Sequence, residues 1–95
     1  MGMYALAFKP TALKEWRKLD APIREQFKRK LPERLAQPHV PASRLHAMPD
    51  CYKIKLQATG YRLVYQVTEL TITVTVVAVG KREDAAVTRK AQERL

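Results

Sequence analysis

The sequence predicts a compact α/β domain of the α+β kind, with an N-terminal strand, a helical hairpin, a three-stranded antiparallel sheet and a short C-terminal helix. Two periodicities indicate this class: apolar residues recur every three or four positions between residues 12 and 35, and every second position within residues 51–67 and 72–78. Length is the third observation, because 95 residues suit one domain with a modest core. We therefore expect a single domain over residues 1–95.

The chain is expected to begin with a strand over Met3–Phe8. A helix should then start at Pro10 or Thr11, since a helix start tolerates proline and favours a hydroxyl. Trp16 is expected to pack in the core rather than to stack on a nucleic-acid base. The apolar stripe of this helix consists of Ala12, Leu13, Trp16 and Leu19.

A second helix is predicted to follow Asp20, a good N-cap residue, with Pro22 in its first turn. Pro32 conflicts with the helical pattern because an interior proline removes a backbone hydrogen bond, so a kink or break is expected there. The buried face repeats every four residues at Ile23, Phe27, Leu31 and Leu35, and the cations expected to face outward are Arg24, Lys28, Arg29 and Arg34.

Residues 37–50 contain three prolines and predict an ordered loop, which Leu45 and Met48 should anchor to the core. A strand is predicted over Thr71–Val79, and a short helix over Ala85–Arg94 closes the chain. The strand alternates at Ile72, Val74, Val76 and Ala78 and then becomes apolar on both faces. That ending predicts a central position in the sheet. In the fold that we expect, the first strand pairs with this last strand and closes the sheet.

Residues 51–67 alternate on either side of a four-residue loop and predict a β-hairpin, in which Gly60 can adopt a positive φ. If Leu56 pairs with Tyr61, Lys55 lies directly opposite Arg62, and Lys53 lies two residues along on the same face. Like charges across a ladder are destabilising, so this face should be exposed or hold an anion. Both Lys55 and Arg62 are expected outside the core, and the other face is apolar, with Tyr52, Ile54, Leu63 and Tyr65.

The charge of the chain is strongly positive, with 18 Lys and Arg against 9 Asp and Glu and a net charge of +9. Nucleic acid is the first candidate for an anionic partner; a solvated basic surface and an acidic protein partner are the alternatives. The lone Cys51 excludes an intramolecular disulfide and fits a reducing compartment. The N-terminal residues are too short for a signal peptide, and no apolar run is long enough to cross a bilayer. We expect a cytoplasmic protein with no membrane partner.

Familiar catalytic patterns are scarce, since there is no Gly-rich phosphate loop and no zinc-ligand spacing. His39 and His46 are expected to be solvated loop residues, although His46 could approach the hairpin, and Cys51 is expected to be a packing group rather than a nucleophile. The cations Lys53, Lys55, Arg62 and Arg82 differ because they should converge. Arginine holds phosphate with two parallel hydrogen bonds, and close like charges disfavour protonated lysine, which would help it act as a base. The alternative is a merely solvated outer face of an amphipathic hairpin.

Five stretches, LKEWRKLD, PIREQFKRKL, MPDCYKIKL, GYRLVYQV and VGKRE, resemble the RelE family within the RelE/ParE superfamily of type II toxin–antitoxin toxins. The resemblance runs through nearly the whole chain. It implies a microbial-ribonuclease-like fold and a ribosome-dependent endoribonuclease that cuts mRNA in the ribosomal A site. The implied chemistry is attack by a 2′-hydroxyl, giving a 2′,3′-cyclic phosphate and a 5′-hydroxyl, without a metal or cofactor. The implied partners are mRNA, 16S rRNA and an inhibitory RelB-like antitoxin.

The resemblance also implies residue roles. Lys55 would be the general base, Lys53 and Arg62 would hold the phosphate, and Arg82 would assist at the leaving oxygen. Further RNA contacts are expected from Arg44, His46, Lys81 and Thr88. Thr88 stands where the family has a catalytic tyrosine, and His46 stands where it has an arginine. The first departure puts the full catalytic rate in question, and the second is expected to weaken RNA contact slightly.

Two rival functions stay open. One is a ParE-like toxin that binds DNA gyrase without catalysis, although such a protein would have no need of the converging cations. The other is an RNA- or ribosome-binding module that has lost cleavage, for which Thr88 is the supporting feature.

Overall fold

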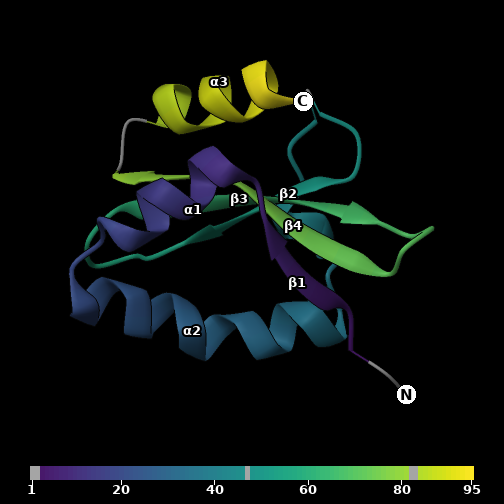
Figure 1. Ribbon diagram of the computed structural model, residues 1–95, viewed down its shortest axis with the longest axis horizontal. Helices are drawn as coiled ribbons and strands as arrows, with labels where there is room; N and C mark the ends of the chain where they lie inside the picture. Colours follow the sequence, from purple (N-terminus) through teal and green to yellow (C-terminus); the bar gives the residue numbers. More distant parts are fainter. Residues whose placement is uncertain (1–2, 47, 82–83) are drawn as a thin grey trace.

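The computed structural model describes residues 3–46, 48–81 and 84–95, with the side chains of 84–86 not described. Its elements follow the predicted order (Figure 1). They are β1 (Ala5–Phe8), α1 (Pro10–Arg17), α2 (Ala21–Ala36), the 3-10 helix η1 (Pro41–Ser43), β2 (Cys51–Lys55), β3 (Tyr61–Thr68), β4 (Thr73–Lys81) and α3 (Asp84–Arg94). The α+β class is confirmed.

The sheet has four strands in the order β1-β4-β3-β2. β1 runs parallel to β4, and the other neighbouring pairs are antiparallel. The predicted pairing of the first strand with the last is therefore confirmed, as is the central position of that last strand. α2 lies on one side of the sheet and α3 on the other (Figure 1).

The α2 side of the sheet carries the larger core, to which α1 and α2 both contribute. Trp16 lies between Phe8 and Phe27, with ring centroids 5.5 and 6.1 Å apart, so its predicted core role is confirmed. The buried residues of this core are Ala12, Leu19, Ile23, Phe27, Leu31, Tyr52, Ile54, Leu56, Leu63, Tyr65, Val67, Val74, Val76 and Val79.

The α3 side carries a smaller core. Leu45 and Met48 pack into it from the loop after η1, which confirms them as anchors. The buried residues are Met48, Cys51, Val64, Val77, Ala78, Val87 and Ala91. Among the described residues, α3 packs mainly over β4 and β3.

A kink or a break was predicted at Pro32; the break is wrong, since α2 runs through this residue without interruption. Pro32 is exposed, while Leu31 beside it is buried in the core. A proline in a helix loses one backbone hydrogen bond. Burial of the apolar face on both sides of it outweighs that loss here.

The predicted face of the last strand is wrong at both ends. β4 begins at Thr73, and Ile72 is an exposed turn residue with φ of 48°. Val64 pairs with Ala78 and Tyr65 with Val76, so Val77 is an extra residue in a β-bulge. The bulge reverses the alternation and turns Ala78 to the α3 side, opposite Val76.

Among the described residues, no helix is both long enough and apolar enough to cross a membrane.

Candidate active site on the central hairpin

The predicted register of the β2–β3 hairpin is confirmed. Tyr52 pairs with Tyr65, Ile54 with Leu63 and Lys55 with Arg62. The four-residue loop is closed by a hydrogen bond of 2.9 Å from the Leu56 N–H to the Tyr61 carbonyl oxygen, and Gly60 has φ of 78°. Glycine adopts a positive φ without steric cost, which suits it to this turn.

The register brings three cations onto the α3 side, and we call Lys53, Lys55 and Arg62 the basic face. Burial increases from the edge of the sheet inward: Lys55 is exposed, Lys53 is half-buried, and Arg62 is only 8% exposed. The expectation that Arg62 lies outside the core is therefore wrong. The reason is that β3 is an inner strand, whose residues are flanked by β2 and β4.

Gly80 allows α3 to approach this face closely because it has no side chain. Gly80 pairs directly with Arg62 across the β3–β4 ladder. A Cβ atom at Gly80 would lie 2.8 Å from the Cγ2 atom of Val87, which is buried on α3. Any side chain here would push the helix away from the strand beside Arg62. Sequence reasoning did not identify this role, because nothing local to Gly80 reveals the helix above it.

Arg34 supports the basic face from the opposite side of the sheet, although it was expected to face outward. Its Nη1 atom donates to the carbonyl oxygen of Lys53 at 3.0 Å and to the Tyr65 hydroxyl at 3.1 Å. Tyr65 in turn stacks on Tyr52, with centroids 5.7 Å apart. These contacts hold the backbone of β2 where it carries Lys53.

The remaining predicted RNA contacts are not all brought to the basic face. The ammonium of Lys81 lies 5.8 Å from the centre of the Tyr61 ring, and Tyr61 packs against the α2-side core. Arg44 is exposed and forms a bridge with Tyr52 at the edge of β2, and His46 is exposed in the following turn. Thr88 is half-buried on α3, next to Val87. Arg82 lies outside the described residues.

Cys51 faces the α3 side and is fully buried, which confirms the prediction that it is a packing group. Burial, with the nearby charge of Asp50, raises the pKa of its thiol to about 11. The thiolate, which is the nucleophilic form, is therefore scarce at neutral pH.

His39 is not the simply solvated residue that was expected. One ring nitrogen lies 2.8 Å from the Tyr52 hydroxyl, and the other contacts the carboxylate of Glu69. Hydrogen bonds from His39 and from the Tyr4 hydroxyl hold the pKa of Glu69 below its usual value. These contacts join the loop before β2 to the turn after β3, far from Lys55 along the hairpin.

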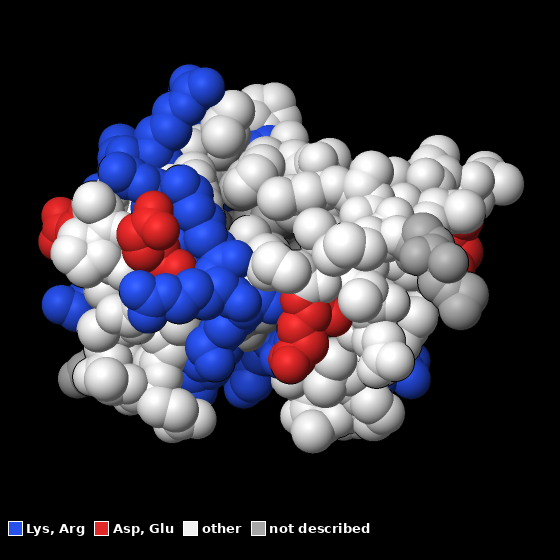
Figure 2. All heavy atoms as spheres, turned by 90° about the horizontal axis from the view of Figure 1, so that it is seen from below, with Lys and Arg blue, Asp and Glu red and all other residues white. Residues whose placement is uncertain are grey.

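Positive charge is not confined to the basic face. Seen from the α2 side, Lys and Arg side chains form a band across the molecule (Figure 2). The exposed cations of α1, its C-cap and α2 are Lys14, Arg17, Lys18, Lys28, Arg29 and Lys30. Net charge alone therefore does not locate the site; the convergence of side chains on one hairpin does.

Known proteins of similar sequence identify the family to which this chain belongs. A family model described as the ParE toxin of the type II toxin–antitoxin system parDE matches residues 6–86. The mRNA interferase toxin RelE of Escherichia coli K12 is 53% identical over 92 residues, which are 97% of each chain. The chain belongs to the RelE/ParE superfamily of type II toxins.

Solved structures of this superfamily share the fold. A mutant E. coli RelE toxin in the free state matches with a TM-score of 0.91 and 51% identity, and covers 99% of both chains. The intact E. coli RelBE toxin–antitoxin complex matches with a TM-score of 0.82 and 56% identity, over 84% of this chain and 98% of that one. The predicted RelE fold is confirmed.

Proposed function

We propose that this RelE/ParE superfamily member is the toxin of a type II toxin–antitoxin pair and cuts mRNA bound in the ribosomal A site. The observation that carries the proposal is the basic face, where two lysines and a largely buried arginine converge. The identity to a toxin named mRNA interferase, over 97% of the chain, supports it. Backbone phosphate is the anion that such a surface suits.

The proposed reaction is an internal transfer at one phosphate. The 2′-oxygen of the preceding nucleotide bonds to phosphorus, the bond from phosphorus to the 5′-oxygen breaks, and a cyclic phosphate and a 5′-hydroxyl result. Lys55, the most exposed member of the basic face, accepts the proton of the 2′-hydroxyl when its amine is neutral. Lys53 and Arg62 stabilise the charge that develops on the phosphate oxygens. Arg82 is assigned to the leaving oxygen by resemblance, through its charge.

Further RNA contacts are proposed for Arg44, His46, Lys81 and Thr88, again by resemblance. Arg44 and His46 are exposed beside β2, as an RNA contact requires. Lys81 serves only if RNA passes the end of β4, because its ammonium lies over Tyr61.

We propose that cleavage requires the ribosome. All three members of the basic face are cations, so this face has no carboxylate–histidine pair to orient an RNA and move its protons. Ribosomal RNA supplies the orientation, and 16S rRNA is the expected contact. Primer extension on mRNA in programmed ribosomes, compared with the same mRNA without ribosomes, tests this. Equal cleavage of naked RNA at the same protein concentration contradicts it.

Lys55→Ala tests the assignment of the basic face. Loss of one preorganised group in an active site commonly costs about 3 kcal/mol of barrier, so a decrease of about a hundredfold in the single-turnover rate is expected. Lys30→Ala on α2 is the matched control, because it removes the same charge from an exposed position on the other side. Equal rates for Lys55→Ala and the parent chain would show that the active site is not on this face.

Arg62 needs a different substitution because it is buried. Arg62→Ala leaves a cavity and is expected to lower stability as well as activity. Arg62→Lys keeps the charge but loses the planar fork that binds phosphate at two points. We expect slower cleavage by Arg62→Lys with a urea midpoint near that of the parent. Parent-like cleavage would exclude two-point phosphate binding by Arg62.

The proposed partner is a RelB-like antitoxin in the cytoplasm. It should neutralise the toxin by wrapping it and disturbing α3, whose buried apolar contacts are few in the described residues: Val87 and Ala91. Hydrogen exchange of the complex and of the free toxin should differ most in residues 85–95. Unchanged exchange throughout that segment would contradict this mode of inhibition.

A gyrase-binding function is the second candidate, because the matching family model is described as a ParE toxin. The two functions predict different readouts for one protein sample. Inhibition of gyrase supercoiling without cleavage of ribosome-bound mRNA would favour the ParE-like function. Cleavage without gyrase inhibition is the outcome that our proposal requires.

A further inference from the structure

β4 loses its parallel neighbour halfway along its length. β1 pairs with it only from Thr73 to Val76, where the Lys9 N–H donates to the Val76 carbonyl oxygen at 3.0 Å. The chain then turns into α1. From Val77 onward, no other strand among the described residues lies on that edge. Unpaired strand groups need other hydrogen-bond partners.

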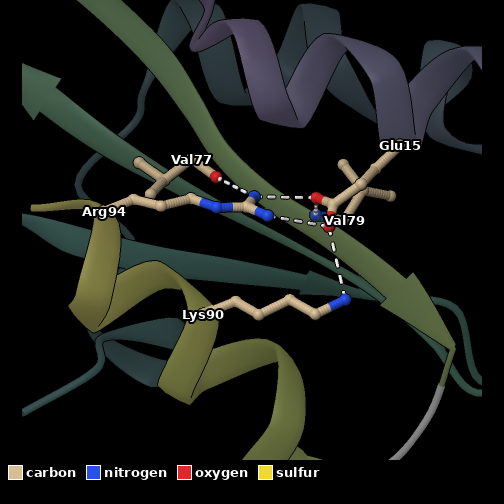
Figure 3. A network of polar contacts seen from close by, with 5 residues as sticks. All are labelled: Glu15, Val77, Val79, Lys90 and Arg94. Atoms are coloured by element: carbon tan, nitrogen blue, oxygen red, sulfur yellow. Dashed lines mark hydrogen bonds and ion pairs between the residues drawn. The ribbon is translucent and has the colours of Figure 1, made fainter.

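Side chains from two helices occupy the open edge (Figure 3). The Val79 N–H donates to Glu15 Oε1 at 3.1 Å, and Arg94 Nη1 donates to the Val77 carbonyl oxygen at 2.9 Å. The two side chains also bind each other at two points, with distances of 2.8 and 3.0 Å. Lys90 donates to Glu15 at 3.3 Å. We call Glu15 and Arg94 the edge clamp.

The edge clamp is partly shielded from solvent, since the side chains of Glu15 and Arg94 are 19% and 21% exposed. Burial by itself raises the pKa of Glu15, but the hydrogen bonds from Arg94 and the Val79 N–H outweigh it and hold the pKa below its usual value. Two-point arginine–carboxylate pairs of this kind fix orientation as well as adding energy. The clamp thus joins α1, the edge of β4 and the last turn of α3.

The position of α3 matters for the basic face. Val87, two turns before Arg94 on α3, packs against Gly80, and Gly80 is the direct partner of Arg62 in the sheet. Packing there is tight enough that one added carbon at Gly80 would clash. A helix that shifts on the sheet therefore changes the packing beside Arg62, whose Nη1 atom donates to the Gly60 carbonyl oxygen at 3.3 Å.

We propose that Glu15 and Arg94 are positioning residues for RNA cleavage: they hold α3 against Gly80 and so keep Arg62 in place. The inference rests on the proposed function. It means that Glu15, a residue of α1, helps to hold α3 on the other side of the sheet. Neither residue needs to touch RNA.

Glu15→Gln is the decisive variant because charge and position predict opposite effects. The substitution removes a negative charge. If Glu15 acted only through its charge, RNA binding would therefore be unchanged or tighter. The substitution also weakens the two-point pair with Arg94. If Glu15 acts by holding α3 in place, cleavage should be slower. We expect the single-turnover rate on programmed ribosomes to fall about tenfold to a hundredfold, the scale of a small misplacement of catalytic groups. The toxin concentration for half-saturation should change less than twofold.

Arg94→Ala should slow cleavage in the same way, and the double variant should be no slower than the slower single variant, because both changes break one interaction. Arg89→Ala is the matched control, since it removes the same charge from an exposed position on the same helix. Its rate should equal that of the parent. All rates are measured at a temperature where circular dichroism shows each variant folded.

Hydrogen exchange in residues 87–94 supplies the second readout. Faster exchange there together with slower cleavage in Glu15→Gln supports the inference. A parent-like cleavage rate in folded Glu15→Gln overturns it, and so does unchanged exchange in α3. A parent chain that does not cleave ribosome-bound mRNA overturns the proposed function instead, and the exchange data still decide whether the clamp holds α3.

Discussion

The two sides of the sheet are built from side chains of different size. Most of the largest fully buried residues, among them Phe27, Tyr65, Ile54 and Leu63, pack on the α2 side. The α3 side has Val64, Val77 and Cys51 under a single helix. On this side Lys55 at the end of β2 is exposed, and the basic face extends from it to the buried Arg62 of β3. The difference indicates that one side supplies most of the folding free energy while the other presents the chemistry.

The largest effect expected from this comparison is on stability. Phe27→Ala empties a fully buried position on the α2 side and should lower the free energy of unfolding by about 3–5 kcal/mol. Val87→Ala removes about two methylene equivalents on the α3 side, worth about 2 kcal/mol at ~0.8 kcal/mol each. Urea unfolding of both variants measures the difference. Equal losses would mean that the two sides contribute alike.

Gly80→Ala sharpens the comparison on the α3 side alone. The added Cβ would lie 2.8 Å from the stiff, buried side chain of Val87, so α3 must move. Overpacking of this kind typically costs about 1–3 kcal/mol. We expect faster hydrogen exchange in α3 and unchanged exchange in α2. Equal exchange in both helices after the substitution would show that the two sides do not open independently.

The hairpin and its basic face could be predicted because they depend on local pattern. Strict alternation on both strands, with Gly60 able to turn, leaves one register that buries Ile54 and Leu63 together. Lys55 then lies opposite Arg62 without any knowledge of the rest of the chain. Family resemblance added the roles of these residues but no geometry.

What could not be predicted depends on contacts between distant segments. The run from Val76 to Val79 is apolar on both faces, so its alternation gave no sign of the bulge at Val77. The burial of Arg62 depends on two neighbouring strands. Glu15 lies among lysines and arginines on α1 and has the pattern of an outward residue. Its partners, Val79 and Arg94, are more than sixty residues away.

Thr88→Tyr tests whether the thin α3 side lacks an aromatic contact to RNA. A tyrosine here could stack on a base, and base–aromatic stacking is worth roughly 1–3 kcal/mol. If the stacking forms only in the transition state, we expect the single-turnover rate on ribosomes to rise about tenfold or more. Thr88→Phe separates the ring from the hydroxyl and should give most of the gain if stacking is the cause. An unchanged or lower rate for Thr88→Tyr would mean that another residue, such as His46, has the role.

The smallest expected effect is the response of the edge clamp to acid. The pKa of Glu15 is lower in the folded chain than its usual 4.5, so the clamp stabilises the fold fully above that value. The contribution is lost as the pH falls through the folded pKa, because the protonated carboxyl no longer pairs with Arg94. Partly exposed ion pairs are worth less than about 1 kcal/mol, and a difference of that size is expected between pH 6 and pH 3. Urea unfolding of the parent, of Glu15→Gln and of Glu25→Gln measures it, since Glu25 is an exposed carboxylate that pairs only with Lys28 in the described residues. Glu15→Gln should flatten the dependence of stability on pH, and Glu25→Gln should leave it close to that of the parent. If both variants kept the parent's dependence, the clamp would add nothing to stability, and its role would be confined to holding α3 in place.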